Sequence, residues 1–284
     1  MSKRADGSYS SAWRGLTIIV VPALLAAFTK HEWHGQDHIR GVPSSSGVIL
    51  AANHLSYADP LPLCLFTHRA ARYPVFLAKS SLFEIKGLGA VMRGTGQLPV
   101  YRGQSDAALV LRDVEQGLRD GACVIFYPEG TATRDPDLWP MVPRTGVARA
   151  ALATGVPVIP VAQWGAQRIL PYGSMHPHLL PRTLVQITAG PPVDLSAFSG
   201  KPLSTQVLRD ATDLIMKDVT GLLGGIRGET PPAEPYHPAI ARRKARQAQA
   251  SAQAGQEPAA AGEGQKTAIT GHSDDSPSSG ATPP

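Results

Sequence analysis

Cysteine is scarce in this sequence: Cys64 and Cys123 are the only two among 284 residues. Each lies inside an apolar run, and the pair shows neither a Cys-x-x-Cys motif nor a spacing typical of metal ligands. We therefore interpret both as buried core thiols. No feature of the sequence requires a disulfide between them, and this cysteine usage fits a reducing compartment.

Several motifs that mark other enzyme classes are absent. There is no Gly-x-Ser-x-Gly, so a serine-hydrolase nucleophile has no candidate, and there is no Gly-x-x-x-x-Gly-Lys-Ser/Thr of a phosphate-binding loop. The segment HEWH, residues 31–34, is one residue short of the His-Glu-x-x-His zinc motif. We therefore expect no metal site and no cofactor.

Long hydrophobic runs are absent as well. The segment Gly15 to Thr29 has 15 residues without a charge and lies between Arg14 and Lys30. It is shorter than the roughly 20 residues of a simple transmembrane helix, and no signal-peptide cleavage site follows it. Two interpretations remain: a helix seated in a membrane interface, with Trp13 and Trp33 as anchors, or an ordinary buried helix. We favour the first.

Large apolar residues are scarce at the end of the chain. Residues 229–284 contain no Leu, Val, Phe, Trp or Met, so they cannot bury enough surface to offset their ordering entropy. They hold 5 of the 27 Lys+Arg and 6 of the 22 Asp+Glu. The rest of the chain therefore has 22 basic and 16 acidic residues, a net charge of +6. We predict three parts: a membrane-associating segment 1–30, a folded domain 31–228 and a disordered tail 229–284. A basic body suits an anionic partner.

From residue 47 onward, short apolar runs alternate with longer mixed segments, which is typical of α/β folds. The helical pattern is clearest over residues 107–119, 144–153 and 204–223, where apolar residues recur on one face. The expected strands are Val48 to Ala52, Val75 to Ala78, Gln97 to Tyr101, Ala122 to Tyr127, Val158 to Gln163 and Thr183 to Thr188.

The strongest local signal is AANHLSYADP, residues 51–60, in which Asp59 follows His54 by five positions. This spacing does not place both side chains on one helical face, so they converge only in a turn. Asp59 before Pro60 resembles a helix N-cap followed by the first helical residue. In such a turn, Asp59 could orient the imidazole of His54 as a base for an alcohol. The alternatives are a plain cap and a structural histidine.

Three further segments follow in order. GTGQLPVYRG places Arg102 just after a predicted strand, where its guanidinium can bind phosphate. VIFYPEGTATR places Glu129, Gly130 and Thr131 directly after another strand, and the flanking Pro and Gly favour a tight turn. VPVIPV, residues 156–161, is typical of a buried strand.

These blocks, NHLSYAD, GTGQLPVYR, YPEGT and VPVIPV, resemble the phospholipid/glycerol acyltransferase family, and within it the 1-acylglycerol-3-phosphate acyltransferases. They match in order over about residues 35–188, and an ordered set is far more specific than one motif. The resemblance implies a single α/β domain of the glycerolipid acyltransferase type, with a mixed, mostly parallel sheet flanked by helices and an N-terminal membrane-associating helix.

The resemblance also implies roles for the motif residues. His54 would be the catalytic base and Asp59 its support, and backbone amides near Gly130 would stabilise the oxyanion. The acceptor would be bound by the residues of the second and third blocks, Arg102, Glu129, Gly130 and Thr131.

The sequence departs from the family pattern in the third block. It has Tyr127 where a phenylalanine is usual, and Ala132 where an arginine is usual. Arg134 or Arg144 would then supply a second basic contact to phosphate.

The expected reaction moves a fatty acyl group from acyl-CoA or acyl carrier protein to the sn-2 hydroxyl of 1-acylglycerol 3-phosphate, giving phosphatidic acid in phospholipid biosynthesis. The expected partners are this donor, the lysophospholipid acceptor and a membrane surface, without nucleic acid. The expected location is the cell membrane, peripheral or monotopic, with the active site on the cytoplasmic side. The alternatives are another lysophospholipid, glycerol 3-phosphate or a glycolipid as acceptor, and a non-catalytic lipid-binding protein.

Overall fold

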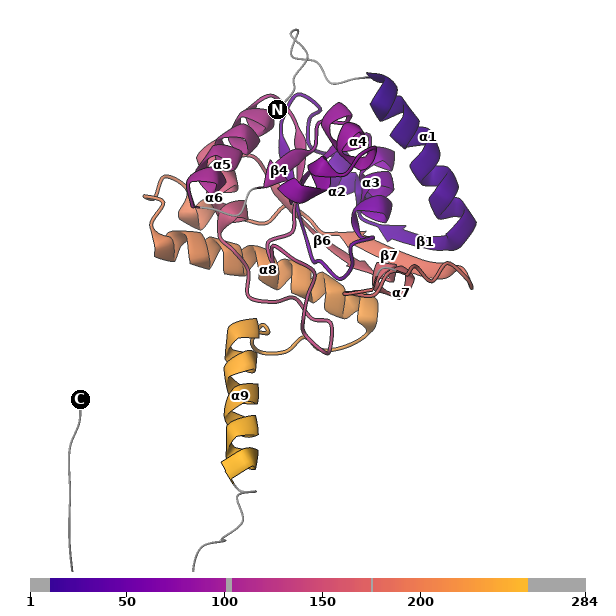
Figure 1. The fold of residues 1–284 in the computed structure, drawn as a ribbon. Helices are drawn as coiled ribbons and strands as arrows, with labels where there is room; N and C mark the ends of the chain where they lie inside the picture. Colours follow the sequence, from indigo (N-terminus) through magenta and orange to yellow (C-terminus); the bar gives the residue numbers. More distant parts are fainter. Residues whose placement is uncertain (1–10, 101–103, 175, 255–284) are drawn as a thin grey trace, which may run out of the picture. The chain divides into compact units, whose positions relative to one another are not determined.

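The computed structural model describes residues 11–100, 104–174 and 176–254. Its centre is a seven-stranded sheet with the order β1-β7-β6-β2-β5-β3-β4 (Figure 1). Neighbouring strands are parallel except β6 and β7, which are antiparallel. This confirms the expected mixed, mostly parallel sheet. The strands are β1 (Thr29–His34), β2 (Val48–Ala52), β3 (Pro74–Lys79), β4 (Leu98–Val100), β5 (Cys123–Phe126), β6 (Val158–Trp164) and β7 (Thr183–Ala189).

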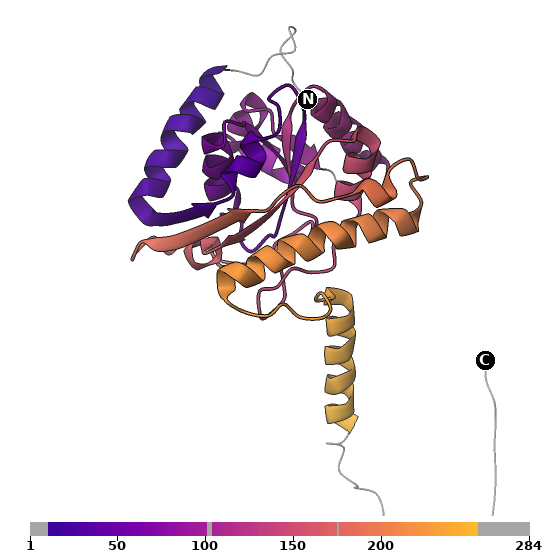
Figure 2. The same cartoon turned by 180° about the vertical axis from the view of Figure 1, so that it is seen from behind.

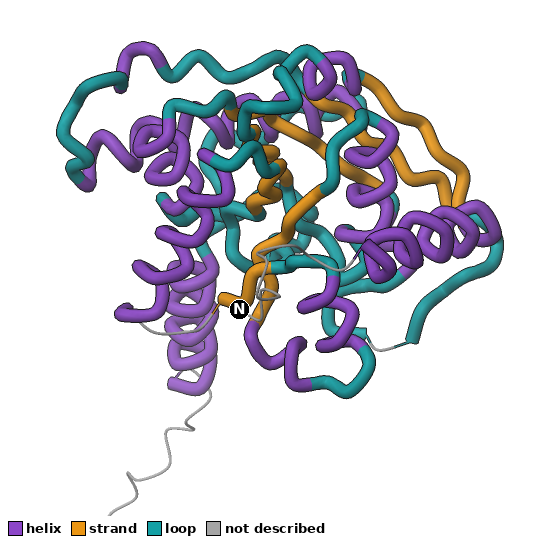
Figure 3. Tube along the Cα trace, turned by 90° about the horizontal axis from the view of Figure 1, so that it is seen from above, coloured by secondary structure: helices purple, strands orange, loops and turns teal. Residues whose placement is uncertain are grey.

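Helices cover both faces of this sheet (Figures 1 and 2), and Figure 3 shows the strands between them. One face packs against α5, α6 and α8 through a core that includes Val114, Val147 and Ile215. The other face packs against α2 and α3 through Ile39 and Phe66. The elements are α1 (Ser11–Phe28), α2 (Gln36–Arg40), α3 (Pro60–Arg69), η1 (Ser80–Glu84), α4 (Leu88–Gly94), α5 (Gln104–Arg119), α6 (Gly146–Thr154), α7 (Ala166–Ile169), η2 (Ser196–Phe198), α8 (Thr205–Arg227) and α9 (Pro238–Ala254).

Two central strands bring the sequence motifs together. β2 and β5 are adjacent and parallel, and Ala51 pairs with Phe126. Because the strands run in the same direction, the residues that follow them leave the sheet at the same edge. The turn after β2 therefore meets the turn after β5, which places His54 beside Glu129.

The apolar N-terminal segment forms α1, which contacts α3 and α4. The Trp13 ring lies directly over Gly94, where a Cβ would come within 2.3 Å of it. On the outer side, Ile19 and Val20 are 71% and 50% exposed. The described helices include none that is long and apolar enough to cross a membrane.

The predicted tail begins at residue 229, and its first residues belong to the same compact unit as α8. Contacts divide the chain into residues 1–239 and 240–284. The first unit retains the proline-rich segment after α8, because Val142 N–H donates to Tyr236 O at 3.0 Å and Pro231 packs near Gly224. In the second unit the described residues belong to α9, whose many Ala, Arg and Gln favour helix. Residues 255–284 of the predicted tail lie outside the described residues.

Candidate active site

His54 and Asp59 converge in the turn between β2 and α3. His54 Nδ1 lies 2.8 Å from Asp59 Oδ2, and the same oxygen accepts the backbone N–H groups of Leu55 and Ser56 at 2.6 and 2.9 Å. Asp59 is fully buried, whereas the His54 side chain is 12% exposed. With Nδ1–H donated to the carboxylate, Nε2 is left with a lone pair that can accept a proton.

Asp59 does not cap α3 in the way that the sequence predicted. It occupies the N-cap position before Pro60, but its side chain makes no capping hydrogen bond and its backbone is already helical. Its Oδ2 instead binds donors from the preceding turn. The carboxylate therefore shapes the 54–59 turn and orients the imidazole, while Pro60 begins the helix as expected.

Glu129 is buried and bridges two backbone segments. It is 5% exposed, and its carboxylate oxygens accept the N–H groups of His54 at 2.8 Å and Met141 at 2.9 Å. Burial raises the pKa of Glu129 to about 8, although the Met141 and His54 amides lower it. Both oxygens hold backbone segments, so this geometry supports positioning of the His54 turn. Acceptor binding by Glu129, which the resemblance implied, stays a prediction.

Gly130 lies at the tight turn after β5 and has a positive φ of 72°. Its N–H donates to Tyr127 O at 2.9 Å, so that amide is engaged within the turn and is not available to an oxyanion. The Arg144 side chain covers Gly130, with Nε 3.0 Å from where a Cβ would stand. A larger residue at 130 would therefore displace this guanidinium.

An exposed polar cluster lies beside the His54 turn and consists of Tyr57, Thr131, Arg134 and Tyr172. Arg134 Nε donates to Tyr172 Oη at 3.4 Å, and the rings of Tyr57 and Tyr172 are 5.8 Å apart. The Arg134 contact lowers the pKa of Tyr172, and contacts with Tyr57 and Thr131 lower it further. Of these four, the sequence indicated Thr131 and Arg134 only, because no motif or spacing marks the tyrosines.

Two hydrogen bonds attach this polar cluster to the His54 turn. Thr133 N–H donates to His54 O at 2.7 Å, and Ser56 Oγ donates to Leu170 O at 2.6 Å. The first bond positions the segment that carries Arg134, and the second positions the loop that carries Tyr172. The cluster therefore lies on loops that are held against the His54 turn.

Asn53, the residue before His54, is joined to Gln163 of β6 by three hydrogen bonds. Gln163 N–H donates to Asn53 Oδ1 at 2.8 Å, Asn53 Nδ2 donates to Gln163 O at 3.1 Å, and Gln163 Nε2 donates to Asn53 O at 2.9 Å. Both residues are buried. Our sequence analysis missed this pair, since 110 residues separate its members and only the β2–β6 pairing joins them.

The two cysteines are free, and neither is suited to nucleophilic chemistry. Burial raises the pKa of Cys64 to about 11 and that of Cys123 to about 12. Both thiols are therefore protonated at neutral pH, which agrees with their interpretation as core residues. Arg102, which the sequence placed in the acceptor site, lies outside the described residues.

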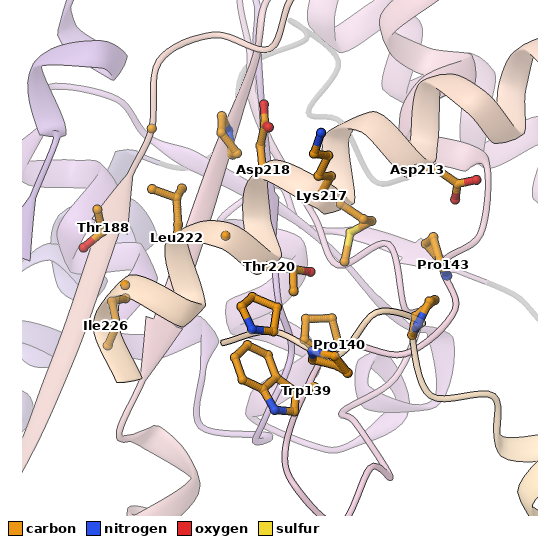
Figure 4. A pocket seen from close by; sticks show the side chains of 18 of the residues that line it. Trp139, Pro140, Pro143, Thr188, Asp213, Lys217, Asp218, Thr220, Leu222 and Ile226 are labelled. Atoms are coloured by element: carbon orange, nitrogen blue, oxygen red, sulfur yellow. The ribbon is translucent and has the colours of Figure 1, made fainter. Parts of the chain in front are cut away.

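A cavity of about 1100 Å³ lies apart from these motif residues (Figure 4). It is bordered by α8, the segment 139–143 and the prolines that follow α8, and none of the six predicted site residues lines it. Its wall includes Met141, whose N–H binds Glu129. The cavity therefore approaches the site through Met141, and the His54–Asp59 pair lies outside it.

The arrangement can activate a hydroxyl group without a covalent enzyme intermediate. An oriented imidazole with a buried carboxylate on its Nδ1 side is the general-base half of a catalytic triad. The hydroxyl group that reacts would have to come from a substrate. Ser56, the serine of the turn, is engaged, because its hydroxyl donates a hydrogen bond to Leu170 O.

Comparison with known proteins agrees with this chemistry. The family model described as Acyltransferase matches residues 30–164. A 1-acyl-sn-glycerol-3-phosphate acyltransferase of Brassica napus chloroplasts is 30% identical over 138 residues, which are 48% of this chain and 38% of the relative. The enzyme of the same name from Borreliella burgdorferi is 34% identical over 122 residues, or 42% of this chain and 46% of the relative.

A relative with a different acceptor in its name matches as well. The lyso-ornithine lipid O-acyltransferase of Rhodobacter capsulatus is 30% identical over 95 residues, covering 34% of this chain and 33% of the relative. The matched region thus spans less than half the length of each of these curated relatives.

The fold also has a counterpart among solved structures. The 1-acyl-sn-glycerophosphate (LPA) acyltransferase of Thermotoga maritima superposes with a TM-score of 0.55 at 25% identity, covering 74% of this chain and 79% of that one. The region that the family model matches, residues 30–164, contains β2, β5 and β6. It also contains the turns that carry the His54–Asp59 pair and Glu129. The match to the Acyltransferase family model thus includes both turns of the candidate site.

Proposed function

We propose that this protein transfers a fatty acyl group from a thioester donor to the sn-2 hydroxyl of 1-acylglycerol 3-phosphate. The observation that carries the proposal is the bond from His54 Nδ1 to Asp59 Oδ2, with that oxygen held by the amides of Leu55 and Ser56. A binding protein has no need of a base with so rigid a support. The names of the relatives favour this acceptor.

In the proposed reaction, His54 Nε2 takes the proton of the acceptor hydroxyl while its oxygen attacks the thioester carbonyl. The imidazolium that forms is stabilised by Asp59. The tetrahedral intermediate then expels the thiolate, and His54 returns the proton to the sulfur. The products are 1,2-diacylglycerol 3-phosphate (phosphatidic acid) and the free thiol of coenzyme A or acyl carrier protein, so the imidazole ends neutral.

The acceptor phosphate is assigned to basic residues on the loops beside the catalytic turn. Arg134 and Arg144 are exposed on the described part of these loops, and Arg102 is proposed as a third contact from its place in the sequence. A guanidinium binds phosphate in two-pronged fashion. Glu129 is assigned a positioning role, because its carboxylate is buried and engaged with backbone amides.

We further propose that α1 and its neighbours rest on the cytoplasmic surface of the cell membrane. Ile19 and Val20 of α1 are exposed, and so are Leu82, Ile85 and Leu88 of the nearby η1–α4 region. Exposed apolar groups of this kind suit the interface of a bilayer, where both lipid substrates reside. Trp13 is not one of these groups, since it packs on Gly94.

The decisive experiment measures transfer of a labelled acyl group from acyl-coenzyme A and acyl carrier protein to a panel of acceptors. The panel contains lysophosphatidic acid, glycerol 3-phosphate, lysophosphatidylcholine and a lyso-ornithine lipid. We expect product with lysophosphatidic acid in the wild type and a loss on the order of 10³-fold or more in His54→Ala. The exposed His38 supplies a matched control, and His38→Ala should retain activity.

The alternative outcomes separate the candidate functions. Transfer to the lyso-ornithine lipid alone, lost in His54→Ala, would keep the mechanism and replace the acceptor; the Rhodobacter relative is the observation that favours testing it. Equal product from wild type and His54→Ala would remove His54 as the base. No product with any donor and acceptor would favour the lipid-binding alternative.

A further inference from the structure

Three polar atoms without hydrogen-bond partners lie buried around the His54–Asp59 pair. They are Tyr127 Oη, Gln163 Oε1 and Asp59 Oδ1. They come from three parts of the fold that meet at one edge of the sheet: the residue after β5, a residue of β6 and the turn after β2. A buried polar atom without a partner is costly, so their meeting at the catalytic turn calls for a functional explanation.

The Tyr127 ring is packed directly against the His54 imidazole. The two ring centroids are 4.2 Å apart with an interplanar angle of 19°. The Tyr127 ring also lies near the Phe76 ring of β3, with centroids 6.4 Å apart and an interplanar angle of 20°. The imidazole is therefore held at its edge by Asp59 and on its face by Tyr127.

Of the three buried atoms, only the Tyr127 hydroxyl can donate a hydrogen bond. Gln163 Oε1 and Asp59 Oδ1 can only accept, whereas a tyrosine hydroxyl can turn its hydrogen toward either. Both neighbours influence it: burial and the Asp59 charge raise the pKa of Tyr127, and the Gln163 side chain lowers it. The hydroxyl thus stays protonated and able to donate at neutral pH.

We propose that Tyr127 is a positioning residue of the active site, which stacks on the His54 imidazole and donates its hydroxyl hydrogen to the Asp59–Gln163 side of the dyad. The inference rests on the proposed role of His54 as a base. Asp59 Oδ2 already serves three donors, so Oδ1 is the oxygen through which a further donor can act.

The two parts of Tyr127 have opposite effects on the protonation of His54. A hydrogen bond from the hydroxyl stabilises the Asp59 carboxylate and weakens its attraction for the imidazolium. The negatively polarised face of the ring attracts the imidazolium. The charged or titratable groups beside these two rings include Asp59, Glu129, whose carboxyl group accepts the His54 backbone N–H, and, for Tyr127, also Cys64. All three are unchanged in the variants below.

The test follows the protonation of His54 directly, by NMR of protein labelled at histidine with ¹⁵N and with His54→Ala used for assignment. In Tyr127→Phe, which keeps the ring, we expect the pH at which His54 gains its proton to rise by roughly half a unit or more. In Tyr127→Leu it should fall relative to Tyr127→Phe, since the ring face is gone. Tyr73→Phe removes a hydroxyl that faces Thr17 of α1 and should change neither value.

Acyl transfer to the active acceptor is measured in the same variants as a second readout. We expect the acidic limb of the kcat profile of Tyr127→Phe to move up with the His54 titration, with little change in the KM of the donor. An unchanged His54 titration in folded Tyr127→Phe would overturn the inference. Absence of transfer in the wild type, with the NMR shift present, would instead overturn the proposed function and leave the positioning role intact.

Discussion

At the scale of single residues, the site depends on carboxylates that are buried and bound to backbone amides. Asp59 fixes the 54–59 turn through Leu55 and Ser56, and Glu129 joins that turn to Met141. Neither carboxylate forms an ion pair with an arginine or lysine within the described residues. Removal of either would leave buried donors unpaired, at a cost of about 1–3 kcal/mol for each group.

Asp59→Asn is expected to lower acyl transfer by a factor on the order of 10³–10⁴, because an amide nitrogen facing Nδ1 favours the wrong tautomer of His54. The rate is measured at saturating acceptor and donor, beside the circular dichroism of the folded variant. Asp37, an exposed residue of α2, gives the control Asp37→Asn. Retained activity in folded Asp59→Asn would contradict the orienting role.

Glu129 predicts a pH dependence of stability. Its carboxyl has a pKa of about 8 when folded against an ordinary value of 4.5, so between these values the folded state holds a proton that the unfolded state releases. The free energy of unfolding therefore falls as pH rises through this window, with a limiting slope on the order of 1 kcal/mol per pH unit, and levels off above it.

Urea denaturation between pH 5 and pH 9 tests this dependence. Glu129→Gln cannot release the proton, so its stability should vary less with pH than that of the wild type. Glu115→Gln on the surface of α5 should instead follow the wild-type curve. Parallel curves for wild type and Glu129→Gln would show that Glu129 titrates in its ordinary range.

At the scale of elements, Arg227 helps to hold α8 to the loop after β5, together with the apolar cluster of Leu223 and Trp139. Arg227 lies between two indole rings, 4.1 Å from the centroid of Trp139 and 4.7 Å from that of Trp164, and it donates to Asp137 O at 2.8 Å. Trp139 O in turn accepts the Thr133 hydroxyl. This side chain thus connects the end of α8 with the segment that hydrogen-bonds to His54.

Arg227→Lys is expected to reduce the free energy of unfolding by about 1–2 kcal/mol, because an ammonium cannot stack between two rings as a planar guanidinium does. Chemical denaturation followed by tryptophan fluorescence measures this change and reports on both rings. Arg209→Lys, on an exposed position of the same helix, should have no measurable effect. Equal losses in the two variants would exclude the stacking explanation.

The exposed face of α1 predicts membrane binding. Ile19→Glu combined with Val20→Glu should weaken sedimentation with vesicles of phosphatidylcholine and phosphatidylglycerol by about tenfold or more, because charges replace two apolar side chains that would enter the bilayer. Thermal stability should hardly change, since both side chains are exposed. Ile240→Glu, an exposed apolar residue of α9, is the control. Equal vesicle binding by all variants would place the membrane contact elsewhere.

At the scale of the whole molecule, the folded unit ends after the proline-rich segment that follows α8. A chain that stops after Ala239 keeps the contact from Val142 to Tyr236 and should match the full chain in stability and acyl transfer. A chain that stops after Gly228 loses this contact, and we expect its free energy of unfolding to fall by about 1–2 kcal/mol. Thermal denaturation of both compares them. Equal stability of the two shortened chains would show that the folded domain ends at residue 228.

Several elements follow from local sequence alone. The expected strand at Val48 to Ala52 has those same limits in the structure, and the helical pattern at 107–119 lies within α5. Apolar runs bounded by turn residues are local signals, and so is Pro60 at the start of α3. The polar strand β1 was not among the expected strands, because most of its residues are exposed or half-buried and it forms by pairing with the distant β7.

The sequence by itself determined the chemistry of the site: the residue types, their order, and the turn that lets His54 meet Asp59. The tertiary structure decided what each group does, because only the pairing of β2 with β5 and β6 brings distant residues together. This pairing buries Glu129 against two amides, joins Asn53 to Gln163 and stacks Tyr127 on His54. Burial and partners set the role of a side chain, and neither can be read from its neighbours in the chain.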